Sequence, residues 1–168
     1  MMKINIAQLR QAIGASQSFS FHGTVEELTG EAGELWLRGR LEVTGEAVNT
    51  GRLLAISGEI KGESALNCDR CLTDFTREVA VTFSETFREE GSAATDPDAL
   101  VYHGDEIDIT EIVREALIVA EPLKALCDEE CRGLCPVCGA NRNENPCNCV
   151  TASIDPRLAA LEKLLPKQ

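Results

Sequence analysis

The sequence predicts an α+β protein, with an antiparallel β-sheet or small barrel as its body, one or two helices, and a C-terminal cysteine-rich zinc-binding segment. Three observations predict this class: apolar residues alternate with polar ones through 17–87, a helical repeat follows, and six of the eight cysteines lie within 127–149. A chain of 168 residues that is 43% apolar can bury a core. We expect a β-rich body over 1–126 with a helix near 108–121, and a zinc-binding segment with a C-terminal helix over 127–168, docked on the body.

Three runs of alternating residues define the predicted strands. Their apolar positions are Leu35, Leu37, Leu41 and Val43, then Leu54, Ile56 and Ile60, and then Val79, Val81 and Phe83. A period of two predicts half-buried strands. Gly39 interrupts the first run and indicates a bulge, whereas Gly45–Gly51 has the composition of a turn. Residues 88–106 show no periodicity and are expected to form a mobile loop.

Two helices are predicted, one on each side of the cysteine cluster. Asp108, with Glu111 three residues on, resembles a capping box. Apolar residues then recur at helical spacing at Ile109, Ile112, Val113, Ala116, Leu117 and Ala120, before Pro122 ends the repeat. The second helix would begin at Asp155 and Pro156. Its four leucines share one face and are expected to pack on the body: Leu158, Leu161, Leu164 and Leu165.

The composition argues against nucleic acid and membranes as the main partners. The net charge is −12, whereas proteins that bind duplex nucleic acid usually present a basic surface. Half of the acidic residues, 14 of 28, lie between positions 80 and 130, where they form either a solvated face or a docking surface for a basic protein. The sequence shows no secretory signal and no stretch of about 20 apolar residues, so we expect a cytoplasmic protein with reduced cysteines.

The cysteine spacing predicts metal binding. Two pairs, Cys68–Cys71 and Cys135–Cys138, have the C-x-x-C spacing of a zinc knuckle. The predicted ligands are all eight cysteines: Cys68, Cys71, Cys127, Cys131, Cys135, Cys138, Cys147 and Cys149. Eight thiolates suit two structural zinc ions in four-cysteine sites, and an iron–sulfur cluster is the alternative.

The sequence leaves the division of the cysteines open. In the preferred division, Cys135, Cys138, Cys147 and Cys149 close one site, and the upstream pair is completed by Cys127 and Cys131. In the other, the two C-x-x-C knuckles share an ion. Both are closed sites of the structural kind, since a catalytic zinc keeps an open position. The two histidines, His22 and His103, are far from the cysteines in sequence and are interpreted as surface or loop residues.

Three arginines lie within the predicted zinc loops: Arg70, Arg132 and Arg142. Zinc knuckles are a recurring RNA-binding module, and arginine can contact phosphate or stack on bases. The other interpretation, which the acidic composition favours, is that these arginines offset thiolate charge through N–H···S contacts.

Three segments together resemble one family. They are "NCDRCL" at Asn67–Leu72, "CDEECRGLCPVCGANRNENPCNC" at Cys127–Cys149, and "DPRLAALEKL" from Asp155. In this order, the chain from about residue 50 onward is similar to the YceD-type proteins, which are named for accumulation of large-subunit ribosomal RNA. Arg142 departs from the apolar residue expected at its place.

The resemblance implies a non-enzymatic ribosome-biogenesis factor that supports synthesis, processing or stability of large-subunit ribosomal RNA. Its expected partner is a ribosomal protein or a precursor particle of the large subunit, with ribosomal RNA contact as a further option. A direct RNA-binding zinc module is the alternative. A nuclease is disfavoured, because the sequence singles out no converging set of carboxylates for metal ions.

Overall fold

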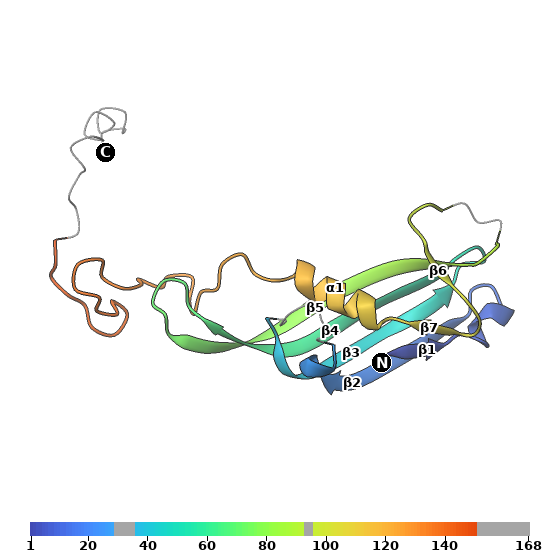
Figure 1. Ribbon diagram of the computed structural model, residues 1–168, viewed down its shortest axis with the longest axis horizontal. Coiled ribbons are helices and arrows are strands. Elements are labelled where there is room, and N and C mark those ends of the chain that lie inside the picture. Colours follow the sequence, from blue (N-terminus) through green and yellow to red (C-terminus); the bar gives the residue numbers. More distant parts are fainter. Residues whose placement is uncertain (29–35, 93–95, 151–168) are drawn as a thin grey trace, which may run out of the picture. The chain divides into compact units, whose positions relative to one another are not determined.

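A computed structural model describes residues 1–28, 36–92 and 96–150 of the protein, and within these ranges it contains two β-sheets and one α-helix (Figure 1). The chain divides into two compact units. Unit 1 comprises Met1–Leu66 and Phe75–Leu123, and unit 2 comprises Asn67–Asp74 and Lys124–Gln168. Each unit is therefore built from two separate stretches of the chain.

A five-stranded sheet forms the body of unit 1. Its strands, in spatial order, are β2 (Ser16–Thr24), β3 (Arg38–Asn49), β4 (Leu54–Asn67), β5 (Asp74–Glu89) and β6 (Leu100–Tyr102). The β2–β3 and β3–β4 pairs are antiparallel, whereas the short β6 pairs with β5 in parallel. The sheet is open: in the described ranges β2 and β6 are its two edges, so it does not close into a barrel.

Shorter elements complete unit 1. They are β1 (Lys3–Asn5), a 3-10 turn at Leu9–Gln11, a second at Val25–Glu27, β7 (Glu106–Asp108) and the helix α1 (Thr110–Val119). Strands β1 and β7 pair antiparallel in a separate two-stranded sheet. The buried face of α1 carries Ile112, Val113 and Leu117, and the indole N–H of Trp36 donates to the Leu117 carbonyl at 2.6 Å.

Among the described residues, the apolar core lies in unit 1. Buried side chains from the sheet, from β1 and β7 and from α1 form a single cluster, with Val43, Ile56, Ile60, Val113 and Leu117 fully enclosed. These residues alternate along the strands and recur at helical spacing along α1, so the predicted strand and helix faces are confirmed.

Two glycines allow aromatic rings to approach the sheet closely. Gly45 on β3 is paired with Gly58 on β4. A Cβ at Gly45 would lie 2.5 Å from the Phe19 ring, and one at Gly58 would lie 2.8 Å from the Phe83 ring. The predicted turn at 45–51 is therefore wrong in its first part, because Gly45 serves close packing within β3 rather than chain reversal.

Three further expectations about unit 1 can be compared with the structure. The bulge at Gly39 is confirmed, since the β3–β4 register shifts between Arg38 and Leu41 and Gly39 has φ of 78°. The loop expected over 88–106 is wrong in part, because β5 continues to Glu89 and β6 and β7 follow. Three-residue strands are too short to show a period in the sequence.

The start of α1 also differs slightly from the prediction. Asp108 lies in β7, and Ile109 occupies the N-cap position. The Asp108 carboxylate nevertheless accepts the backbone N–H of Thr110 at 2.9 Å, so it supplies the hydrogen bond that a cap would supply. The predicted C-terminal helix and Leu35 lie outside the described residues.

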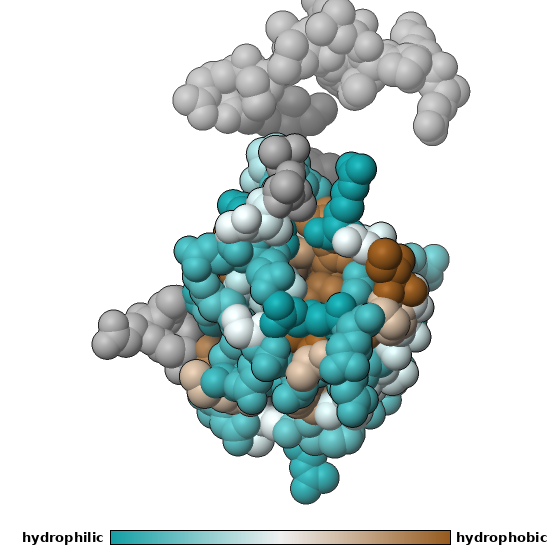
Figure 2. Space-filling view, turned by 90° about the vertical axis from the view of Figure 1, so that its right-hand side faces the viewer, coloured by the Kyte–Doolittle hydropathy of each residue, from teal (hydrophilic) through white to brown (hydrophobic). Residues whose placement is uncertain are grey.

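The surface of unit 1 is mainly polar at the end shown in Figure 2, where hydrophilic side chains surround small hydrophobic areas. His103 is exposed and its Nδ1 lies 2.8 Å from Glu90 Oε2, and His22 lies on β2, so both are surface residues as predicted. Within the described ranges, no helix is both long and apolar enough to cross a membrane.

Candidate metal centres

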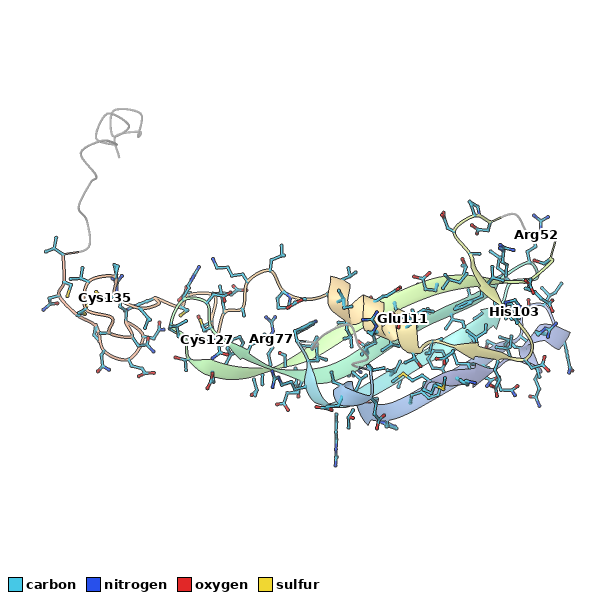
Figure 3. The ribbon with its side chains drawn as sticks, viewed as in Figure 1. Arg52, Arg77, His103, Glu111, Cys127 and Cys135 are labelled. Atoms are coloured by element: carbon cyan, nitrogen blue, oxygen red, sulfur yellow. The ribbon has the colours of Figure 1, made fainter. Side chains whose placement is uncertain are left out.

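The first cysteine cluster joins two distant parts of the sequence within unit 2. Cys68 and Cys71 lie in the loop between β4 and β5, and their sulfur atoms meet those of Cys127 and Cys131. All four Sγ atoms lie within 4.8 Å of one another. Figure 3 shows Cys127 beside that loop.

The sulfur separations in this cluster fit a tetrahedral metal ion. The Cys68 and Cys131 Sγ atoms are 3.8 Å apart, and the Cys71 and Cys127 Sγ atoms are 3.6 Å apart. A disulfide would need about 2.05 Å. Four sulfurs placed about 2.3 Å from a central zinc lie about 3.8 Å apart, because that is the edge of the tetrahedron. The first cluster is therefore compatible with one four-coordinate ion.

The second cluster is local in sequence. The Sγ atoms of Cys135, Cys138, Cys147 and Cys149 also lie within 4.8 Å of one another. Figure 3 labels Cys135, which is buried, whereas Cys138 is exposed and the last two are half-buried. The structure thus brings the eight cysteines together in the preferred division, and not in the one that pairs the two C-x-x-C knuckles.

Both C-x-x-C pairs fold into the same backbone turn. In the first knuckle, the Cys68 N–H donates to the Thr73 carbonyl at 2.9 Å and the Leu72 N–H to the Cys68 carbonyl at 2.8 Å. In the second, Cys135 N–H donates to Ala140 at 2.9 Å and Gly139 N–H to Cys135 at 2.8 Å. This turn requires a left-handed residue after the second cysteine.

The left-handed position is filled differently in the two knuckles. Gly139 adopts φ of 73° without a side chain to clash, whereas Leu72 adopts φ of 60°. A left-handed conformation costs a residue with a Cβ roughly 1–2 kcal/mol. The first knuckle therefore carries a local cost that the second avoids.

Backbone N–H groups prepare one sulfur of each knuckle for the thiolate form. Hydrogen bonding from the backbone of Cys127, with smaller contributions from that of Cys71 and Arg70, lowers the pKa of Cys68 to about 6. In the second cluster, the backbone N–H groups of Cys138 and Val137 lower the pKa of Cys135 to about 6. Metal ligands must be thiolates, so these contacts favour binding.

One thiol in each cluster, Cys127 in the first and Cys149 in the second, resists ionisation. Cys127 is exposed overall, but its thiol is partly removed from water. This desolvation and, to a smaller extent, the adjoining sulfur of Cys68 raise the pKa of Cys127 to about 12. In the second cluster, the sulfurs of Cys138 and Cys147 raise the pKa of Cys149 to about 12. Four thiolates this close repel one another, and a divalent cation at their centre would remove that repulsion.

Two polar side chains contact the sulfurs and were not singled out in the sequence. Asn143 Nδ2 donates to the Cys131 sulfur at 3.2 Å, and Thr73 Oγ1 lies 3.4 Å from the Cys71 sulfur. Thr73 could have been suspected, because it follows Cys71 by two residues. Asn143 could not, because its contact depends on how the segment after the second knuckle folds back.

The three arginines have different environments. Arg70 Nη1 donates to the carbonyls of Glu129 and Cys131, at 3.0 and 2.9 Å, so it holds the first knuckle to the segment that supplies the other two sulfurs. In the part of the chain that the structure describes, this guanidinium donates to carbonyl oxygens rather than to sulfur, and its contact with RNA stays a prediction. Arg132 and Arg142 have exposed side chains, and only their backbone N–H groups make hydrogen bonds that the structure defines.

We expect Arg70→Met to weaken metal binding at the first cluster, by about 10–100-fold as for other residues that orient metal ligands. The variant keeps the aliphatic stem and loses both carbonyl hydrogen bonds. Competition with a chromophoric chelator measures the affinity. Arg132→Met is the matched control, because within the described residues Arg132 makes a hydrogen bond through its backbone N–H and none through its side chain. Equal affinities for the two variants would contradict the positioning role of Arg70.

Together the fold and site define a protein with a mainly antiparallel sheet, one helix in the described ranges, and two four-cysteine clusters compatible with two metal ions. The chain belongs to the family described as "Large ribosomal RNA subunit accumulation protein YceD", whose sequence model matches residues 56–165. This match confirms the resemblance and begins close to the expected residue 50.

Similar proteins extend the comparison to almost the whole chain. It is 33% identical to the uncharacterized protein YlbN of Bacillus subtilis, over 98% of this chain and 96% of that protein. It is 30% identical to the uncharacterized protein Rv2926c of Mycobacterium tuberculosis, over 98% of this chain and 81% of that protein. An Arabidopsis thaliana protein, "Large ribosomal RNA subunit accumulation protein YCED homolog 1, chloroplastic", is 41% identical over 44 residues, which are 26% of this chain and 14% of that one. No solved structure matches.

Proposed function

We propose that the protein is a non-enzymatic ribosome-biogenesis factor that supports synthesis, processing or stability of large-subunit ribosomal RNA, and that two structural zinc ions fold its unit 2. Family membership carries the ribosomal part of this proposal. The closed four-cysteine geometry supports the structural part, because a catalytic zinc keeps one position open for water or substrate.

Zinc is the metal that best suits these sites. Four thiolates in a tetrahedron are a common structural zinc site. The 3.6 and 3.8 Å sulfur separations of the first cluster fit that arrangement, and the sulfurs of the second cluster all lie within 4.8 Å of one another. A polynuclear iron–sulfur cluster would hold its cysteines farther apart, because several iron and sulfide ions lie between them. A colourless protein with two zinc ions per chain is the expected result of metal analysis.

Charge favours a protein partner over naked RNA. The chain has a net charge of −12, and two zinc tetrathiolates would make it −16. Such a protein attracts basic polypeptides and repels phosphate at long range. Ribosomal proteins of the large subunit, alone or within a precursor particle, are the proposed partners, and the reducing cytoplasm is the compartment in which the thiols would stay available to zinc.

Sedimentation of cell extract at low salt tests the proposal. The tagged protein is expected to migrate with large-subunit precursors, and its depletion should lower the ratio of large-subunit to small-subunit ribosomal RNA. A protein that stays at the top of the gradient, in cells whose ribosomal RNA ratio does not change on depletion, would rule the proposal out.

A direct RNA-binding zinc module is the second candidate, and the exposed side chains of Arg132 and Arg142 favour it. If both contact phosphate, the double variant Arg132→Ser/Arg142→Ser should bind large-subunit ribosomal RNA more weakly. It should also show a salt dependence reduced by roughly 0.7–0.9 for each lost phosphate contact. An unchanged affinity and salt slope would remove this candidate.

A further inference from the structure

Leu72 is unusual in both its backbone and its side chain. Among the described residues it is the one non-glycine residue with positive φ, at 60°. Its side chain is also 65% exposed, although leucine is usually buried. The residue thus combines an unfavourable backbone conformation with apolar surface in water, and neither feature stabilises the free protein.

The second knuckle shows that the turn does not need a leucine. Gly139 occupies the equivalent position, and the two knuckles share the same two backbone hydrogen bonds with lengths that agree within 0.1 Å. A glycine at position 72 would form the same turn without strain. Residues with a strained backbone conformation cluster at functional sites. Because the turn does not require a leucine, we look for the role of Leu72 in its exposed side chain.

The segments that build the first cluster, one of which contains Leu72, are acidic. The residues that build the first cluster, 67–74 and 124–134, contain five acidic and three basic residues, and a zinc tetrathiolate would add a further −2. Asp69, Asp74 and the run 128–130 are exposed. The nearest cation in sequence, Arg70, is engaged with two backbone carbonyls. Leu72 is therefore an exposed apolar side chain within segments whose net charge is negative.

We propose that the tip of the first knuckle is a docking surface for a basic polypeptide segment, with Leu72 as its apolar anchor. An aliphatic or aromatic side chain of the partner would cover Leu72, and flanking lysines or arginines would face the acidic residues. This surface repels nucleic acid, so it selects a protein. The inference rests on the proposed function. It identifies the surface through which the protein would contact a basic protein of the large subunit.

Two substitutions separate docking from folding. Leu72→Gly removes the side chain and relieves the backbone, and Leu72→Asn keeps a side chain that tolerates the left-handed conformation. Val137→Ser is the matched control, because Val137 is 63% exposed on the second knuckle. Hydrogen exchange of residues 67–74 in the zinc-loaded protein measures folding. Binding is measured with a fluorescent lysine-rich peptide that carries leucines, against a peptide of the same charge without leucine.

We expect the leucine-containing peptide to bind the wild-type protein in a salt-sensitive manner. Both Leu72 variants should bind it about tenfold more weakly or worse, and Val137→Ser should bind it normally. Leu72→Gly should exchange no faster than wild type. Faster exchange in Leu72→Gly would mean that Leu72 packs against this chain's own residues, including 151–168, and would overturn the proposal.

The same variants separate this inference from the proposed function. If wild type and Leu72→Gly sediment equally with large-subunit precursors, the docking surface is wrong and the proposed function stands. If the peptide binds both proteins equally, the docking surface is wrong, and sedimentation alone then decides the proposed function. If neither sediments with precursors while the peptide distinguishes them, the surface stands and its ribosomal partner is wrong. Failure of the peptide to bind wild type overturns the surface outright.

Discussion

Replacing Cys68 by serine is expected to remove one zinc ion per chain and to leave the second in place. Cys68 is fully buried, and its sulfur lies 3.8 Å from that of Cys131. A serine hydroxyl is not ionised at neutral pH and is a harder ligand than thiolate, so the first cluster would lose most of its affinity. Metal analysis with mass spectrometry of the intact, natively folded protein counts the ions.

Cys135→Ser is the matched variant for the second cluster. Cys135 is nearly as buried as Cys68, and hydrogen bonds to its sulfur come from within its own knuckle. It should also leave one ion, and the double variant should leave none. If either single substitution released both ions, the two clusters would not be independent sites, and the division by sulfur proximity would not describe metal binding.

The sequence predicts most of the local geometry of these clusters, because local geometry depends on neighbours in the chain. The C-x-x-C spacing brings two sulfurs to one turn in each knuckle, and Gly139 supplies the left-handed residue that the turn needs. The sequence does not decide which cysteines share an ion. It favours the division that joins Cys68 and Cys71 to Cys127 and Cys131, but it leaves the other division open. The joining depends on contacts between residues 56 to 63 positions apart.

The same distinction explains what the sequence does not reveal. Arg70 lies between two cysteines, and its hydrogen bonds to the carbonyls of Glu129 and Cys131 cannot be predicted, because both partners lie far along the chain. Gly45 resembles a turn residue, because glycine composition alone does not distinguish chain reversal from close approach of an aromatic ring. In the sheet, by contrast, alternation over many residues predicts the buried face of β3 and β4 correctly.

Metal removal is expected to unfold unit 2 and to leave unit 1 folded. Every buried residue that the structure describes in unit 2 is a cysteine or Gly133, whereas the apolar core of the described residues lies in unit 1. The described part of unit 2 thus lacks buried aliphatic side chains, and the hydrophobic stabilisation of that part is small. In zinc-finger peptides, metal binding supplies about 10–16 kcal/mol of apparent free energy, and that energy is folding energy.

Hydrogen exchange of the full chain, before and after treatment with a strong chelator, measures this difference. Amides in 67–74 and 124–150 should lose their protection, including the Leu72 and Gly139 N–H groups that close the two knuckles. Amides of β3, β4 and α1 within unit 1 should exchange as before. Zinc should restore protection and magnesium should not, because magnesium prefers oxygen ligands. Protection that persists in 124–150 without metal would mean that packing, and not zinc, holds unit 2 together.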